Sequence, residues 1–196
     1  MKLPDYTVIN GKGAVKMFQT VFKRYEKKYI IDGGQYEELK NYLTYNAVPD
    51  EYGKSRVCSL YYDTPGNSLI CASLDKPIYK EKLRLRSYGV PTADKPCFLE
   101  LKKKYKGIVF KRRISAPYTD IKSYMAGEDS GIENSQILNE IDYFRRFYGC
   151  LKPAADIFYD REAFYDRTDS SVRLTFDSNI LARGWDLELE NGIYGE

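Results

Sequence analysis

The chain has 196 residues, 31 Lys and Arg against 28 Asp and Glu, and a formal net charge of +3. This length suits one domain with a substantial core, and the small charge argues against a general nucleic-acid binder. The absence of histidine excludes a Ser-His-Asp triad and a His-ligated zinc site. The four cysteines are scattered, so we expect no zinc cluster and a reducing, cytoplasmic location. No apolar run is long enough to span a membrane.

The first third of the chain predicts a tail followed by the start of a sheet. We expect residues 1–21 to be an N-terminal tail or adapter and residues 22–196 to form a single domain. Aromatic and β-branched residues predict a strand over residues 22–31. Apolar residues at helical spacing predict a short helix over residues 35–45, and a second strand follows over residues 57–63.

Three segments in the middle of the chain alternate strictly between charged and apolar residues. They cover residues 80–88, 97–104 and 108–115, and short glycine-containing loops separate them. A period of two is typical of strands that bury one face only. The sequence therefore predicts an antiparallel meander at this point.

The last third combines one clear helix with two strands. A helix is predicted over residues 135–148, with Ser135 as its N-cap. Two strands follow, at about residues 156–165 and 172–181. With seven strands and two or three short helices, the expected fold class is α+β, mainly antiparallel β with flanking helices.

The alternation places the charged side chains of the meander on one face, because residues two apart in a strand share a face. These side chains are Lys82, Arg84, Arg86, Glu100, Lys102, Lys104, Lys111 and Arg113. Clustered cations repel one another unless an anion compensates them, and arginine forms forked contacts with phosphate. One interpretation is an ordinary solvated face. The other is a closed barrel whose interior carries the charged set and binds a polyphosphorylated ligand.

Several short motifs occur in a characteristic order along the chain. They are Arg24–Tyr29 (RYEKKY), Tyr61–Thr64 (YYDT), Lys80–Gly89 (KEKLRLRSYG), Phe98–Lys104 (FLELKKK), Phe110–Arg113 (FKRR), Tyr159–Phe164 (YDREAF) and Val172–Asp177 (VRLTFD). In this combination the sequence resembles the VTC domain, the catalytic domain of polyphosphate polymerases, over about residues 22–181. The VTC domain belongs to the triphosphate tunnel metalloenzymes, a CYTH-like group.

The resemblance implies both a fold and an activity. The fold would be a tunnel-type barrel of eight antiparallel strands with flanking helices. The activity would be transfer of the ATP γ-phosphate to a growing polyphosphate chain, with Mn²⁺ or Mg²⁺ as the divalent metal. ATP and polyphosphate or triphosphate would then be the partners, and no nucleic acid. A membrane partner and the oligomeric state stay open.

The resemblance also implies roles for individual side chains. The residues that would act in catalysis are Lys28, Arg84, Arg86, Lys102, Arg161 and Arg173. Those that would extend the phosphate-binding surface are Lys82, Lys111 and Arg113. Glu26 and Glu100 are the carboxylates available for a metal, although Glu100 has neighbouring cations with which it can pair instead. Tyr61 and Asp63 are expected to serve strand packing and the following turn.

Two departures from the family pattern keep other functions open. The CYTH first strand reads E-x-E-x-K, whereas this chain has Arg24-x-Glu26-x-Lys28, which favours the polymerase branch. The family's last strand, with its metal-binding Glu, and the helix with a further essential Lys are not found. We therefore expect a C-terminally truncated domain whose barrel has an open edge. The alternatives are an inorganic triphosphatase of the same fold and a non-catalytic polyphosphate-binding module.

Overall fold

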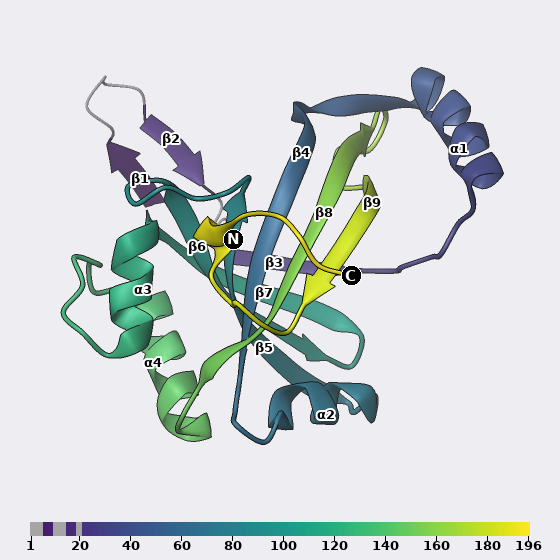
Figure 1. The fold of residues 1–196 in the computed structure, drawn as a ribbon. Helices are drawn as coiled ribbons and strands as arrows, with labels where there is room; N and C mark the ends of the chain where they lie inside the picture. The colour runs from purple at the N-terminus through teal and green to yellow at the C-terminus, as the bar shows by residue number, and fades with distance from the viewer. Residues whose placement is uncertain (1–5, 10–14, 19–20) are drawn as a thin grey trace.

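The computed structural model of the protein describes residues 6–9, 15–18 and 21–196, with side chains from Tyr25 onward. Its elements, in chain order, are β1 (Tyr6–Ile9), β2 (Val15–Phe18), β3 (Val21–Tyr25), α1 (Gly33–Asn46), β4 (Ala47–Asp63), α2 (Ser68–Leu74), β5 (Tyr79–Tyr88), β6 (Pro96–Tyr105), β7 (Ile108–Pro117), α3 (Tyr118–Ala126), α4 (Gln136–Tyr148), β8 (Lys152–Asp166), β9 (Arg173–Arg183) and the 3-10 turn η1 (Leu189–Asn191) (Figure 1). The predicted α+β fold, mainly antiparallel with flanking helices, is confirmed.

A seven-stranded antiparallel sheet forms the body of the protein, in the order β3-β7-β6-β5-β4-β8-β9. Within the part of the chain that the structure describes, β3 and β9 are its two edges, so the sheet is curved but not closed. At the outer edge of β9, Ala182 exchanges two backbone hydrogen bonds of 2.9 Å with Glu196. β1 and β2 form a separate antiparallel pair.

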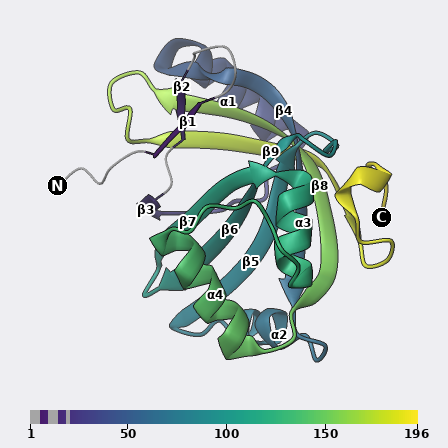
Figure 2. The same cartoon turned by 90° about the vertical axis from the view of Figure 1, so that its left-hand side faces the viewer.

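The apolar face of the sheet carries the core. Leu83, Leu85, Leu99 and Leu101 are fully buried there, because alternate residues of β5 and β6 point to the same side. Helices α3 and α4 cover this face of β5, β6 and β7 (Figure 2) and complete the apolar cluster with aromatic and aliphatic side chains. The charged set of the meander is thereby left on the opposite face, which no helix of this pair covers.

The helix predicted over residues 135–148 is confirmed as α4. The Ser135 side chain accepts a hydrogen bond of 3.1 Å from the Leu138 backbone N–H and caps the helix. Ile141 and Phe144, on one side of the helix, are buried against the sheet. The helix predicted over residues 35–45 is also confirmed, as α1, and its capping box is formed by Asp32 and Gln35.

Two strand boundaries differ from the sequence prediction. β3 ends at Tyr25 instead of continuing to residue 31, because its partner β7 begins at Ile108, directly opposite Tyr25, and offers no further ladder. β4 begins ten residues before residue 57 and pairs with β8 along most of its length. The prediction missed this half because Pro49 and a bulge before Lys54 interrupt the alternation.

The two helices α2 and α3 were not predicted. α2 has seven residues, which is too short for a clear period. α3 does carry a readable signal, since Tyr118, Ile121 and Tyr124 recur at every third position and are buried. Further along, Leu189 in the C-terminal segment is fully buried in the same apolar cluster.

The expected domain division stays a prediction. Residues 1–5, 10–14 and 19–20 of the expected tail lie outside the described residues. The remainder of that tail contains β1 and β2, a strand pair that the composition did not indicate. The sheet and its flanking helices begin with β3, close to the expected boundary at residue 22.

Asp63 accepts hydrogen bonds from the first turn of helix α2 and gives a test of local stability. Its carboxylate accepts backbone hydrogen bonds from Thr64, Leu69 and Ile70, at 2.7, 2.9 and 3.0 Å. Replacing Asp63 by alanine leaves the buried Leu69 N–H without this acceptor, so we expect a loss of about 2 kcal/mol in the free energy of unfolding. Urea unfolding measures it. Asp75→Ala, at the exposed far end of α2, is the control, and an equal loss in both variants would contradict the prediction.

Candidate functional site

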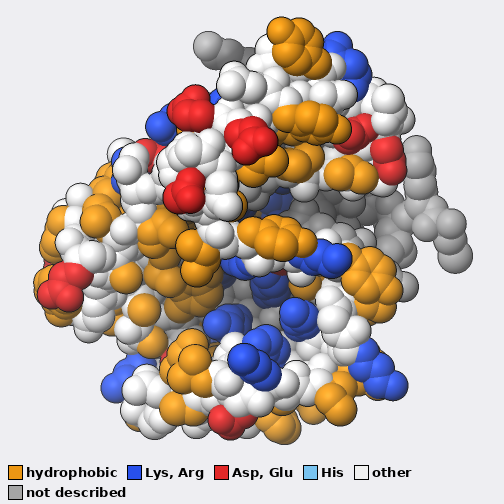
Figure 3. Space-filling view, turned by 90° about the vertical axis from the view of Figure 1, so that its right-hand side faces the viewer, with side chains coloured by type: hydrophobic (Ala, Val, Ile, Leu, Met, Phe, Trp, Pro, Cys, Tyr) orange, Lys and Arg blue, Asp and Glu red, His pale blue; other side chains and the backbone are white. Residues whose placement is uncertain are grey.

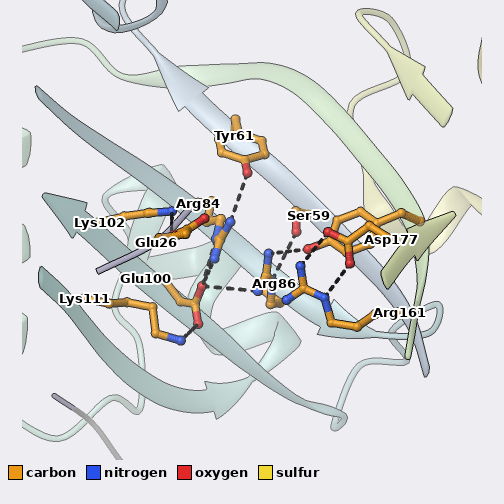
Figure 4. Close-up of polar contacts among 11 residues, drawn as sticks. Glu26, Ser59, Tyr61, Arg84, Arg86, Glu100, Lys102, Lys111, Arg161 and Asp177 are labelled. Carbon is orange, nitrogen blue, oxygen red and sulfur yellow. Dashed lines mark hydrogen bonds and ion pairs between the residues drawn. The ribbon is translucent and has the colours of Figure 1, made fainter. Parts of the chain in front are cut away.

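A buried carboxylate lies at the centre of the charged face. The Glu100 side chain on β6 is 0% exposed. Its Oε2 lies 2.8 Å from Arg84 Nε, 2.6 Å from Arg84 Nη2 and 3.9 Å from Arg86 Nη1, and its Oε1 lies 3.2 Å from Lys111 Nζ. Figure 4 shows these four side chains pointing toward one another from three neighbouring strands. We call these four residues the Glu100 cluster.

The sheet register explains why these residues meet. Arg84 on β5 is directly opposite Glu100 on β6, and Glu100 is directly opposite Arg113 on β7. Residues directly opposite each other in an antiparallel pair share a face. The alternation in each strand therefore becomes a continuous charged surface across three strands, as the sequence predicted. Figure 3 shows Lys and Arg side chains gathered in a hollow on this side of the molecule.

Neutral hydroxyl groups complete the hydrogen bonds of the two arginines. Arg84 Nη1 donates to the Tyr61 hydroxyl at 3.0 Å. Arg86 Nε donates to Ser59 Oγ at 3.2 Å, and Arg86 Nη2 donates to the Tyr159 hydroxyl at 3.0 Å. These three partners come from β4 and β8. The guanidinium groups are thus held by a charged contact on one side and by hydroxyls on the other.

Burial and charge oppose each other in the Glu100 cluster. Burial alone would raise the pKa of Glu100, but Arg84 and Arg86 outweigh burial and hold that pKa well below its ordinary value. Burial lowers the pKa of Lys111 to about 7, since the attraction of Glu100 is countered by repulsion from nearby arginines. The contact between Lys111 and Glu100 therefore favours the charged form of Lys111, whereas burial and the neighbouring arginines disfavour it.

Tyr61, expected to serve strand packing, also contacts the Glu100 cluster through its hydroxyl. Burial raises the pKa of its hydroxyl, but Arg84 and Arg86 act in the opposite direction and leave it below the ordinary value. The sequence signal was present, because Ser59 and Tyr61 are two residues apart on β4 and share a face. Tyr159 was missed in the same way, two residues before Arg161 on β8. The turn role expected for Asp63 is confirmed by its hydrogen bonds to α2.

A lysine-rich group lies along the same face, toward the ends of β5 and β6. Lys102 Nζ lies 2.8 Å from Glu26 Oε2. Burial lowers the pKa of Lys102, and the contact with Glu26 only partly offsets this effect. Lys82 is directly opposite Lys102, and burial, together with Lys28 and other neighbours, lowers its pKa.

Lys28 does not take the expected place on the first strand. It follows the end of β3, its side chain is 79% exposed, and its Nζ lies 3.7 Å from Glu26 Oε1. Because Glu26 contacts both Lys28 and Lys102, Lys28 lies near the lysine-rich group, although outside the paired strands. The side chain of Arg24, the departure from the E-x-E-x-K pattern, lies outside the described residues.

The remaining predicted cations lie farther along the sheet. Arg161 makes a forked contact with Asp177 on β9, at 2.7 Å for both nitrogens, and this contact holds its pKa above the ordinary value despite burial. Arg173 Nη2 lies 2.6 Å from Asp50 Oδ2. Arg173 is four residues from Asp177 on β9, about 13 Å along the strand. The structure therefore does not bring Arg173 into the Glu100 cluster.

Arg113 occupies the β7 side of the charged face. Its guanidinium carbon lies 4.5 Å from the ring centre of Phe98, a cation–π contact. Burial lowers its pKa, and Glu100, Tyr88 and Tyr52 act in the opposite direction while Arg86 adds to the lowering. Arg113 thus lies directly opposite Glu100 and in contact with the ring of Phe98 on β6.

A preformed metal cage is not found in the part of the chain that the structure describes, where no group of three or more acidic or sulfur ligands is close enough to hold a metal ion. Both candidate carboxylates have cationic partners. Glu26 contacts Lys102 and Lys28, and Glu100 is surrounded by the other members of its cluster. Neither carboxylate alone provides enough oxygen ligands for a divalent metal, which would need further ligands such as phosphate oxygens.

The comparison with protein families decides the identity. The model of the VTC domain matches residues 23–193, which includes the whole charged face from β5 to β9. The chain belongs to the VTC domain family. The family supports a tunnel fold that binds triphosphate or polyphosphate, and a fold of the phosphotransferase type.

Two other comparisons accompany this assignment. The curated proteins give no match. Among solved structures, 17 chains match. One is a protein from Bacillus halodurans described as a "putative adenylate cyclase", with a TM-score of 0.46 and 11% sequence identity over 82% of this chain and 80% of that chain. Among the described helices of the VTC domain, none has the length and apolar character needed to cross a bilayer.

Proposed function

We propose that this VTC domain is an ATP–polyphosphate phosphotransferase. In this proposal, ATP and the end of a polyphosphate chain bind along the charged face, and the γ-phosphate of ATP passes to the chain. The single observation that supports the proposal best is the Glu100 cluster. Arginines held by a buried carboxylate on one side and by displaceable hydroxyls on the other suit a ligand with several phosphates.

The chemistry requires little from the protein beyond positioning and charge. Phosphoryl transfer passes through a loose transition state with charge on the equatorial oxygens, so electrostatic stabilisation dominates. The acceptor would be a terminal phosphate that is already ionised at neutral pH. A strong general base is then not needed, which agrees with a chain that has no histidine. Arg84 and Arg86 would contact the transferred phosphates, with Lys102, Arg161 and Lys111 along the path.

The divalent metal would enter with the substrate in this proposal. Magnesium is commonly bound by one or two carboxylates together with substrate phosphates, and manganese prefers similar oxygen ligands. Glu26 is the more accessible of the two candidates, since its side chain is 25% exposed and that of Glu100 is not exposed.

All four cysteines are free thiols, which suits a reducing compartment such as the cytoplasm.

Incubation with ATP and Mn²⁺, followed by a gel stained for long polyphosphate, tests the proposal. We expect a ladder of long chains together with ADP. Replacement of ATP by ADP is the control that must give no chains. Release of inorganic phosphate from tripolyphosphate, with no polymer from ATP, would instead identify an inorganic triphosphatase and contradict the polymerase.

A non-catalytic polyphosphate-binding module is the second candidate. The observation that favours it is the pairing of both candidate carboxylates with cations in the described residues. This candidate predicts salt-sensitive binding of polyphosphate with no turnover of ATP or tripolyphosphate. Isothermal titration calorimetry at two ionic strengths, beside the gel assay, separates it from the two enzymes.

A further inference from the structure

The arginines of the Glu100 cluster have two kinds of acceptor, the charged carboxylate of Glu100 and neutral tyrosine hydroxyls. The Glu100 carboxylate is fully buried and contacts guanidinium and ammonium groups from β5 and β7, the strands on either side of β6. The outer donors of Arg84 and Arg86 bond to neutral hydroxyls of Tyr61 and Tyr159. Phosphate oxygens can replace a hydroxyl at a guanidinium, because the charged acceptor makes the stronger hydrogen bond. Replacement of Glu100 is harder, because its carboxylate is fully buried and is bound by several cations at once.

The cluster also depends on Glu100 for its stability. Arg84, Arg86 and Lys111 all lie within 3.9 Å of one carboxylate, and their side chains are only 12%, 6% and 13% exposed. Cations gathered around one carboxylate repel one another where water screens them little. A single fixed anion between them lowers this repulsion and sets the direction of each cation. The two-point contact to Arg84, through Nε and Nη2, also fixes the plane of its guanidinium group.

We propose that Glu100 is a positioning residue: an internal counter-ion that stays in place beneath Arg84, Arg86 and Lys111 and aims them at the phosphates of the substrate. This inference rests on the proposed function, because it assumes that phosphates bind on the charged face. It assigns Glu100 a role that differs from metal binding. Both carboxylate oxygens already contact cations, at 2.6 to 3.2 Å, so a metal would have to displace these cations.

A pair of variants separates positioning from simple charge. Lys111→Gln keeps the carboxylate and removes one cation. Lys111→Gln with Glu100→Gln removes the carboxylate as well, and therefore carries one more positive charge than the single variant. If only charge matters, the double variant binds tripolyphosphate more tightly. If Glu100 positions the arginines, the double variant binds more weakly, by about tenfold or more, because a charged hydrogen-bond network is lost.

Titration calorimetry with tripolyphosphate in EDTA measures these affinities without a metal. The matched control is Arg112→Gln with Glu140→Gln, a pair at 3.4 Å on the helix-covered face, which we expect to leave the affinity unchanged within about twofold. Equal or tighter binding by the double variant overturns the positioning role. Failure of the wild-type protein to bind tripolyphosphate overturns the proposed function as well, so the two failures are distinguishable.

The wild-type protein supplies a second measurement that does not depend on the folding of a variant. The Nε–H of Arg84 donates to Glu100 at 2.8 Å and should give a protected resonance in nitrogen-15 NMR spectra. We expect this protection to persist when tripolyphosphate saturates the protein, because the carboxylate stays beneath the guanidinium. A scalar coupling between Arg84 Nε and phosphorus-31 across a hydrogen bond, or loss of the protection, would show that Glu100 no longer accepts from Arg84 in the bound state, and would overturn the inference.

Discussion

Replacing Arg84 and Arg86 together by alanine should lower the affinity for tripolyphosphate by about 100-fold or more. Each hydrogen bond to a charged partner contributes about 1.5–3 kcal/mol, and every 1.4 kcal/mol is about a factor of ten in affinity. Titration calorimetry at constant ionic strength measures the change. Because both arginines also pair with the buried Glu100, we expect the alanine variant to lose stability as well.

Two further variants separate the binding effect from the loss of stability. Arg84→Lys with Arg86→Lys keeps both charges beside Glu100 but removes the forked geometry, so we expect nearly normal thermal unfolding and about tenfold weaker binding. Arg112→Ala, on β7 but facing α4, is the control that should bind normally. Unchanged affinity in the alanine variant would exclude the charged face as the triphosphate site.

Replacing Arg183 by alanine should destabilise the protein by about 3–5 kcal/mol, the usual cost of breaking a buried ion pair. Arg183 Nη2 lies 2.9 Å from Asp156 Oδ2, and both side chains are 0% exposed. The same guanidinium donates to the carbonyls of Glu188 and Gly192 at 2.8 and 3.0 Å, and lies 4.1 Å from the ring centre of Tyr194. It therefore holds the C-terminal segment against β8 and β9.

Urea unfolding and the melting temperature measure this effect, and a fall of about 10 °C corresponds to it in a chain of this size. Arg146→Ala, exposed on α4, is the control and should change stability little. The double variant Asp156→Leu with Arg183→Leu should recover part of the loss, since no unpaired charge stays buried. A single variant as stable as the wild type would contradict this account of the C-terminal segment.

Local patterns were sufficient for the centre of the sheet. β5, β6 and β7 alternate without interruption, so their existence, order and faces could be read from residues two apart. The prediction was wrong where the alternation depends on a partner strand. β3 ends at Tyr25 because β7 begins directly opposite it, so Lys28 lies outside the paired strands. The first half of β4 is a strand because β8 pairs with it.

In the candidate site, the sequence likewise predicted the charged residues but not their uncharged partners. Arg84, Arg86, Glu100 and Lys111 were all predicted, because charge and spacing are local properties. Their neutral partners were not, since Tyr61 and Tyr159 meet the arginines across 23 and 73 residues of sequence. Likewise, the pairing of Arg173 with Asp50 spans 123 residues and removes Arg173 from the cluster.

The amino-acid sequence by itself determined which side chains share a face, because the two-residue period of a strand needs no information from elsewhere in the chain. Only the tertiary structure decided that one carboxylate would be buried among three cations, and which hydroxyls would complete their hydrogen bonds. Those contacts depend on the register between strands and on the curvature of the sheet. Both are set by packing of the opposite, apolar face against α3 and α4.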